Sequence, residues 1–238
     1  MERVHSYKKR IRRDTLIKLF TSAYFIVSVI EIIAEYFNDT MLIYLIKPFI
    51  IPSLVLIYWF SSRKKNLLYV AALLLSLAAN IFFVSRNFQS ILIGSIFFFF
   101  HRALIIQIVL KHIRLPGIFP MIVGCIPFLF GYLYLIIMTY SKIDEGLIIF
   151  IVQCLLISFL GGISVGNYIL RSSLGNTLLL LSTLLFAVTQ FVFVLKLYYS
   201  ENNIFQPLAM ILFVLGQYLF CRFLLLAEKK KAGYEMRL

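Results

Sequence analysis

Charged side chains are scarce in this sequence. Only 14% of its 238 residues are charged, whereas 62% are hydrophobic. An average soluble domain has about 25% charged residues. A chain with so few charges lacks the polar surface that a water-facing globule needs. The composition therefore excludes a soluble globular domain and predicts an integral membrane protein.

Cysteine and histidine are also few, with three of each. The cysteines lie in apolar stretches without C-x-x-C spacing, so we interpret them as buried packing thiols. His5 and His112 belong to basic polar segments and are not expected to gather with the third histidine, His101. We therefore predict no metal site and no cofactor.

Acidic residues number 10 against 23 Lys and Arg, which gives a net charge of +13. In a soluble protein such a charge would favour nucleic acid as a partner. Here the basic residues cluster at the chain ends and in alternate polar breaks, a pattern typical of membrane topology. Nucleic acid is therefore not a predicted partner.

Long apolar runs dominate what is present. A spanning helix needs about 20 mostly apolar residues, and short polar breaks divide the chain into eight such runs. The predicted spans are Thr15–Phe37, Met41–Phe60, Leu67–Val84, Ile91–Leu110, Ile118–Met138, Leu147–Leu170, Thr177–Tyr198 and Ile204–Leu226. Helices joined by breaks this short must be antiparallel neighbours, so we predict an all-α bundle of eight transmembrane helices.

The first of these runs follows a basic N-terminus, as the apolar part of a signal peptide does. It continues to Phe37, however, and carries Lys18, Glu31 and Glu35. We interpret it as a retained first span. The expected organisation is a basic tail over residues 1–14, a transmembrane domain over 15–227 and a second basic tail over 228–238.

The positions of the basic residues predict the orientation. With eight spans, sixteen Lys and Arg fall on the side of both termini, and only Arg86 and Lys142 fall on the other side. Because cytoplasmic loops carry the excess of positive charge, both termini are expected in the cytoplasm. The expected location is the cell (inner) membrane.

Ionisable and amide side chains inside spans are costly and are candidates for function. Counting about 1.5 Å per helical residue brings six of them to a similar depth, from the middle to the outer half of the bilayer. They are Glu31, Lys47, Asn80, His101, Gln190 and Gln217. This shared depth predicts a polar pocket, and the alternative is a set of separate hydrogen bonds between helices.

The other charged residues within spans are expected to lie outside this pocket. Arg102 follows His101 and points about 100° away from it on the helix, so we expect it to pair elsewhere or to face a water-filled crevice. Glu35 and Lys196 lie near the outer ends of their spans and are expected to reach water. Lys18 and Arg222 lie near the cytoplasmic ends and are expected to do the same.

Several motifs then resemble a known family. They are Lys47-Pro48 followed by Pro52, the stretch LLLSLAANIFF ending the third span, the Phe88, Gly94 and His101 pattern, and the last two spans with Gln217. In order and spacing they resemble the YhhN family of eight-span membrane proteins, which includes the lysoplasmalogenases. The resemblance implies a hydrolase of the vinyl-ether bond of a lysoplasmalogen, which yields a fatty aldehyde and a glycerophospho-alcohol.

The sequence departs from the family pattern at two positions. The family has Gly-Asp where this chain has Ala79-Asn80, and Ser-Asp where it has Thr189-Gln190. Vinyl-ether hydrolysis needs a proton donor at carbon and a group that orients water. Amides exchange no proton at ordinary pH, although they can hydrogen-bond a hydroxyl group or a phosphate oxygen.

Three functions follow as hypotheses. The first is a pocket that binds a membrane lipid, such as a lysolipid or ether lipid, with hydrolysis weakened or lost. The ligand would be bound by Lys47, Asn80, Gln190 and Gln217. The Lys47 ammonium group would hold the phosphate group of the lipid. The second is an active hydrolase with Glu31 or His101 as acid and base.

The third hypothesis is a transporter with helices broken at Pro48, Pro52, Gly161 and Gly162. The sequence leaves the lipid headgroup open. It also leaves the oligomeric state open, a homo-oligomer included.

Overall fold

The computed structural model describes residues 2–85, 87–142, 146–199 and 202–235, and the side chains within 13–231 of these ranges. Every regular element in them is helical. The helices are α1 (Glu2–Phe37), α2 (Thr40–Ser61), α3 (Leu67–Phe82), α4 (Phe88–His112), α5 (Ile118–Thr139), α6 (Leu147–Leu170), α7 (Leu174–Tyr198) and α8 (Phe205–Glu235), with a short 3-10 turn at Tyr140–Lys142. The all-helical prediction is confirmed.

The polar breaks end one helix and cap the next. The side-chain oxygens of Asp39, Asn66 and Asn87 accept hydrogen bonds from backbone N–H groups in the first turns of α2, α3 and α4, at 3.1, 3.1 and 2.8 Å. Ser173 does the same for α7. Asn38 has φ 53° between α1 and α2, a left-handed conformation that asparagine tolerates. These short polar residues therefore form the tight turns that the sequence predicts.

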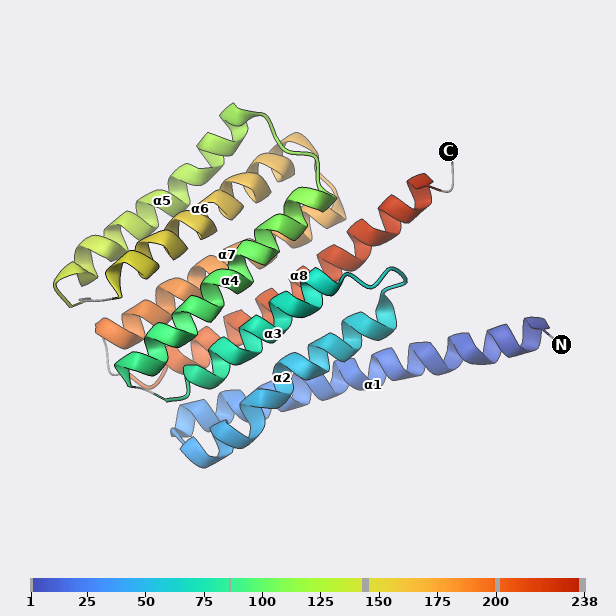
Figure 1. Cartoon of the computed structure of the whole chain (residues 1–238), viewed down its shortest axis with the longest axis horizontal. Coiled ribbons are helices and arrows are strands. Elements are labelled where there is room, and N and C mark those ends of the chain that lie inside the picture. Colours follow the sequence, from blue (N-terminus) through green and yellow to red (C-terminus); the bar gives the residue numbers. More distant parts are fainter. Residues whose placement is uncertain (1, 86, 143–145, 200–201, 236–238) are drawn as a thin grey trace.

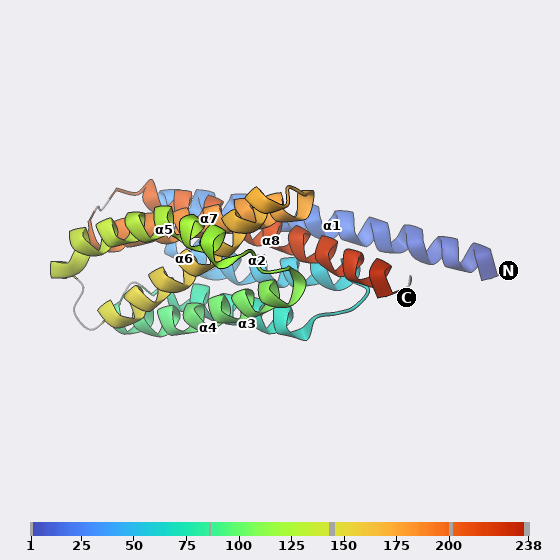
Figure 2. The same ribbon diagram turned by 90° about the horizontal axis from the view of Figure 1, so that it is seen from above.

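Neighbouring helices close into a ring. α1 packs on α2, α2 on α3, α3 on α4, α4 on α6, α6 on α7, α7 on α8, and α8 on α1 again, while α5 packs outside this ring, chiefly on α6. Figure 1 shows that α1 begins and α8 ends at the same end of the bundle. In Figure 2, α3 and α4 lie on the opposite side of the bundle from α1 and α7.

Seven of the described helices are long and apolar enough to cross a membrane, and α3 is the shorter apolar helix. Large hydrophobic side chains such as Phe119, Phe130 and Ile137 of α5 are exposed on the outside. The chain is therefore a multi-pass membrane protein. With 16 residues, α3 is about 24 Å long, less than the roughly 30 Å of a bilayer core, so an eighth span stays a prediction.

The positions expected to interrupt helices in a transporter lie inside continuous helices. Pro48 and Pro52 lie within α2, and Gly161 and Gly162 lie within α6. A Cβ at Gly162 would come within 2.6 Å of the Met121 carbonyl oxygen on α5. This glycine allows α5 and α6 to approach closely. The expectation of broken helices at these four positions is therefore wrong.

Candidate functional site

A large cavity lies inside the ring, toward the end opposite the termini. It encloses about 960 Å³ between atoms, part of it open to the outside. Its outer part is lined next to the helix connections by Phe88, Gly146 and Tyr198. Its inner part reaches Gln153 and Phe213, deeper in α6 and α8.

The cavity wall is mostly aromatic and apolar. Six phenylalanines line it: Phe83, Phe88, Phe98, Phe150, Phe193 and Phe213. Three of the predicted ligand-binding residues, Lys47, Asn80 and Gln190, also line it, together with Gln206. A mainly apolar cavity with a few polar groups is the usual form of a small-molecule site.

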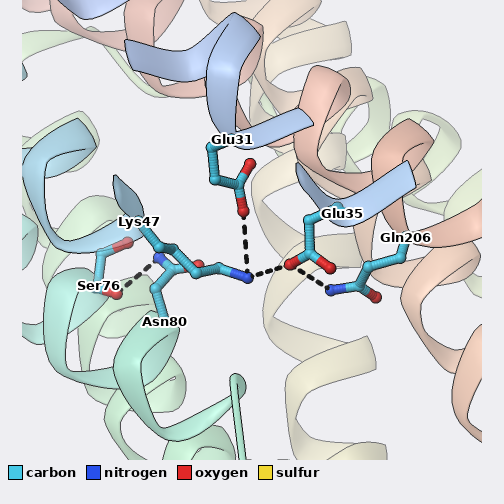
Figure 3. Close-up of polar contacts among 6 residues, drawn as sticks. All are labelled: Glu31, Glu35, Lys47, Ser76, Asn80 and Gln206. Carbon is cyan, nitrogen blue, oxygen red and sulfur yellow. Dashed lines mark hydrogen bonds and ion pairs between the residues drawn. The ribbon is translucent and has the colours of Figure 1, made fainter. Parts of the chain in front are cut away.

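On one side of the cavity, which we call the lysine side, Lys47 and Gln206 line the wall, and Glu31 and Glu35 contact them from behind it. The glutamates lie four residues apart on α1, so both side chains point toward α2 (Figure 3). Lys47 Nζ lies 2.6 Å from Glu35 Oε1 and 3.4 Å from Glu31 Oε1. Gln206 Nε2 of α8 donates to Glu35 Oε1 at 3.4 Å.

The expectation that Glu35 reaches water is therefore wrong. Its side chain is only 3% exposed because Lys47 and Gln206 cover it from two other helices. Glu31 is fully buried, and neither of its carboxyl oxygens accepts a hydrogen bond from any residue that the structure describes. Two carboxyl groups thus share one ammonium group. The net charge of the lysine side is therefore zero only when one of the two carboxyl groups is protonated.

Asn80 lies on the cavity wall near the end of α3. Its Nδ2 donates to the Ser76 carbonyl oxygen at 2.8 Å (Figure 3). Like Lys47, Asn80 lines the cavity. An amide there can hydrogen-bond a ligand but cannot exchange a proton with it.

His101 and Gln217 form a separate group that does not line the cavity. His101 Nδ1 lies 2.8 Å from the Ala72 carbonyl oxygen. Because a carbonyl only accepts, Nδ1 carries the proton, and Nε2 accepts from Gln217 Nε2 at 3.3 Å. Gln217 also donates to Ser76 Oγ at 3.4 Å. These bonds join α3, α4 and α8.

On the other side of the cavity, which we call the arginine side, Gln153 and Gln190 line the wall, and Arg102 contacts both from behind it. Arg102 of α4 donates to the side-chain oxygen of Gln190 on α7, and to the Gln153 backbone carbonyl of α6 at 3.4 Å. Gln153 Nε2 donates to the Ser95 carbonyl oxygen at 2.9 Å. Arg102 is only 3% exposed. The expectation that it pairs away from His101 is confirmed.

The six residues predicted to share a pocket thus fall into three places. Lys47, Asn80 and Gln190 line the cavity, Glu31 lies behind Lys47, and the His101–Gln217 pair lies apart. Glu35, Gln153 and Gln206 were not among the predicted site residues. The four-residue spacing of Glu31 and Glu35 was the available signal for Glu35, because it places both carboxyl groups on one helix face.

A metal site would need several histidine, cysteine, aspartate or glutamate side chains together. No group of three or more of them is placed to hold a metal ion in the described part of the chain. Glu31 and Glu35 have Lys47 between them, and this ammonium group occupies the position that a cation would take.

Comparison with known proteins assigns the family. The family model described as the YhhN family matches residues 42–224, from the start of α2 to the middle of α8. No curated protein and no solved structure gives a significant match. The matched region contains the whole cavity and every predicted site residue except Glu31. The chain belongs to the YhhN family.

Proposed function

We propose that this protein binds a single-chain lipid, a lysolipid or ether lipid, in the cavity, and that its vinyl-ether hydrolysis is weakened or lost. The observation that carries the proposal is the composition of the cavity wall. Six phenylalanines suit a hydrocarbon chain, while Lys47, Asn80, Gln190 and Gln206 supply polar groups for a glycerol or headgroup.

The loss of hydrolysis follows from the amides at positions 80 and 190. The resemblance to the lysoplasmalogenases places aspartates there, and both positions line the cavity. Hydrolysis begins with protonation of a vinyl carbon, continues with water addition to the oxocarbenium ion, and ends with collapse of the hemiacetal to aldehyde and alcohol. General acid–base catalysis contributes about 10²–10⁴-fold, so replacing both acids with amides removes most of the rate.

The lysine side favours a second candidate function, an active hydrolase. Glu35 contacts both Lys47 and Gln206, which line the cavity, and Glu31 lies next to it. One carboxyl group of this pair, when protonated, would donate the proton, and the other would orient water. His101 is a less suitable acid, because its Nδ1 proton is bonded to the Ala72 carbonyl oxygen.

We also propose eight spans with both termini in the cytoplasm and the cavity in the outer half of the cell membrane. The sixteen-to-two distribution of basic residues supports this orientation. Of the two basic residues on the outer side, Lys142 is described and Arg86 lies outside the described residues. The common end of α1 and α8 in Figure 1 agrees with an even number of spans.

The test measures lipid binding and aldehyde release together. Purified protein in lipid nanodiscs is incubated with a lysoplasmalogen, and bound lipid and free aldehyde are quantified. The unmodified protein is expected to bind the lipid and to release little aldehyde. The Asn80→Asp/Gln190→Asp variant is expected to release at least about 10²-fold more aldehyde than the unmodified protein. Asn87→Asp, at the exposed cap of α4, is the control and should change neither quantity.

The two candidates give different outcomes. Rapid aldehyde release by the unmodified protein that disappears in Glu35→Gln or Glu31→Gln would establish the active hydrolase instead. Absence of lipid binding by the folded unmodified protein would overturn both candidates.

A further inference from the structure

Arg102 is a buried cation without a nearby anion. The residue is only 3% exposed, and no carboxylate of the described residues lies within 4 Å of its guanidinium group, since both ion pairs among them belong to Lys47. Its contacts are the Gln190 side-chain oxygen, the Gln153 carbonyl oxygen and the face of Phe98, with Cζ 5.1 Å from the ring centroid. These groups supply only partial negative charge.

The three residues that hydrogen-bond or stack with Arg102 also line the cavity. Phe98, Gln153 and Gln190 are all wall residues of its inner part, so the guanidinium lies directly behind the wall. In a low-dielectric site an unbalanced charge is costly, and a ligand anion that approaches it recovers much of that cost. Among the residues that the structure describes, Gln190 is the only one whose side chain is hydrogen-bonded to Arg102.

The lysine side is not a comparable anion site. The Lys47 ammonium is already matched by two carboxyl groups, at 2.6 and 3.4 Å. A phosphate approaching Lys47 would therefore meet the negative charge of Glu35 and Glu31 as well. Although phosphate binding was predicted for Lys47, the positive charge that remains without a counter-charge is that of Arg102.

We propose that Arg102 and Gln190 form an anion subsite at the inner part of the cavity, which takes the phosphate group of the bound ligand. This inference rests on the proposed lipid-binding function and specifies how the ligand is oriented and selected. The phosphate replaces the Gln190 side-chain oxygen as the acceptor for Arg102. Guanidinium groups bind phosphate through two parallel hydrogen bonds, which is stronger than a single bond to an amide.

The test compares two lipids with the same single acyl chain, a lysophosphatidylcholine and a monoacylglycerol, which differ in the phosphate-bearing headgroup. Equilibrium binding is measured with the protein in nanodiscs. The unmodified protein is expected to bind the phospholipid at least about 10-fold more tightly than the neutral lipid. In Arg102→Met this preference is expected to fall to below about 2-fold, while affinity for the neutral lipid is retained.

A second variant keeps the test decisive if Arg102→Met does not fold. Gln190→Glu places a carboxylate beside Arg102 and supplies the missing counter-charge within the protein. It is expected to abolish the phospholipid preference and to raise the melting temperature. Glu228→Gln at the other end of the bundle, where Glu228 accepts from Tyr58 and Ser62, is the control and should retain the preference.

The outcomes separate the two proposals. If neither lipid binds the unmodified protein, the lipid-binding function fails and the subsite with it. If both lipids bind equally, the function stands and the anion subsite is wrong. Inorganic phosphate is added as a competitor, because Arg102-dependent displacement of the phospholipid at millimolar phosphate would assign the subsite to free phosphate rather than to a lipid headgroup.

Discussion

On the lysine side of the cavity, two carboxyl groups surround one ammonium group, whereas on the arginine side one guanidinium group meets only amide and carbonyl oxygens. Both sides are buried within the ring of helices. The first has an excess of acid, and the second has an excess of positive charge. The two cations therefore have different roles, since Lys47 holds the carboxyl groups together and Arg102 remains available to an anion.

The largest expected effect comes from replacing each cation with methionine. Lys47→Met leaves two buried carboxyl groups without a counter-charge and should lower the free energy of unfolding by about 3–5 kcal/mol. Arg102→Met removes an unbalanced charge and should change it by no more than about 1 kcal/mol, or raise it. Chemical unfolding of the purified protein in detergent measures both.

Lys18→Met, at an exposed position of α1, is the control for the loss of a lysine and should have little effect. Equal destabilisation by Lys47→Met and Arg102→Met would contradict the contrast between the two sides.

Replacing either glutamate of the lysine side should have a smaller effect, and the loss of unfolding free energy should differ between the two. Glu35→Gln weakens the 2.6 Å contact with Lys47 and the bond from Gln206, so it should cost about 1.5–3 kcal/mol of unfolding free energy. Glu31→Gln should cost less than about 1 kcal/mol, because the remaining carboxylate still neutralises Lys47 and Glu31 accepts no described hydrogen bond. The same unfolding measurement ranks them, and the reverse order would show that Glu31 is the main partner of Lys47.

The helices themselves were well predicted from the sequence. In the described part of the chain, apolar runs and polar breaks placed both ends of α2 to α7 within three residues of the observed bounds, whereas α1 begins 13 residues earlier and α8 ends nine residues later than predicted. α4 and α7 begin three residues earlier than predicted, because Asn87 and Ser173 cap them. The tail boundaries at residues 14 and 228 stay predictions, since α1 and α8 run without interruption past them.

The site was only partly predictable, because depth along a helix does not define the direction of a side chain. Lys47 and Gln190 share both a depth and a cavity, whereas His101 shares the depth and faces Ala72 and Gln217 instead. Glu35 was expected to reach water because it lies near a helix end. Its burial depends on Gln206, which is 171 positions away in the chain, and no local pattern shows such a contact.

Photolabelling shows whether the cavity holds a single-chain lipid. A lysolipid with a diazirine in its acyl chain is bound to the protein in nanodiscs and irradiated, and labelled residues are identified by mass spectrometry. We predict labels on cavity residues such as Phe150, Phe193 and Met210, which excess unlabelled lysolipid removes. Labels confined to outward-facing residues such as Phe119, Phe130 and Tyr134 of α5 would contradict the claim.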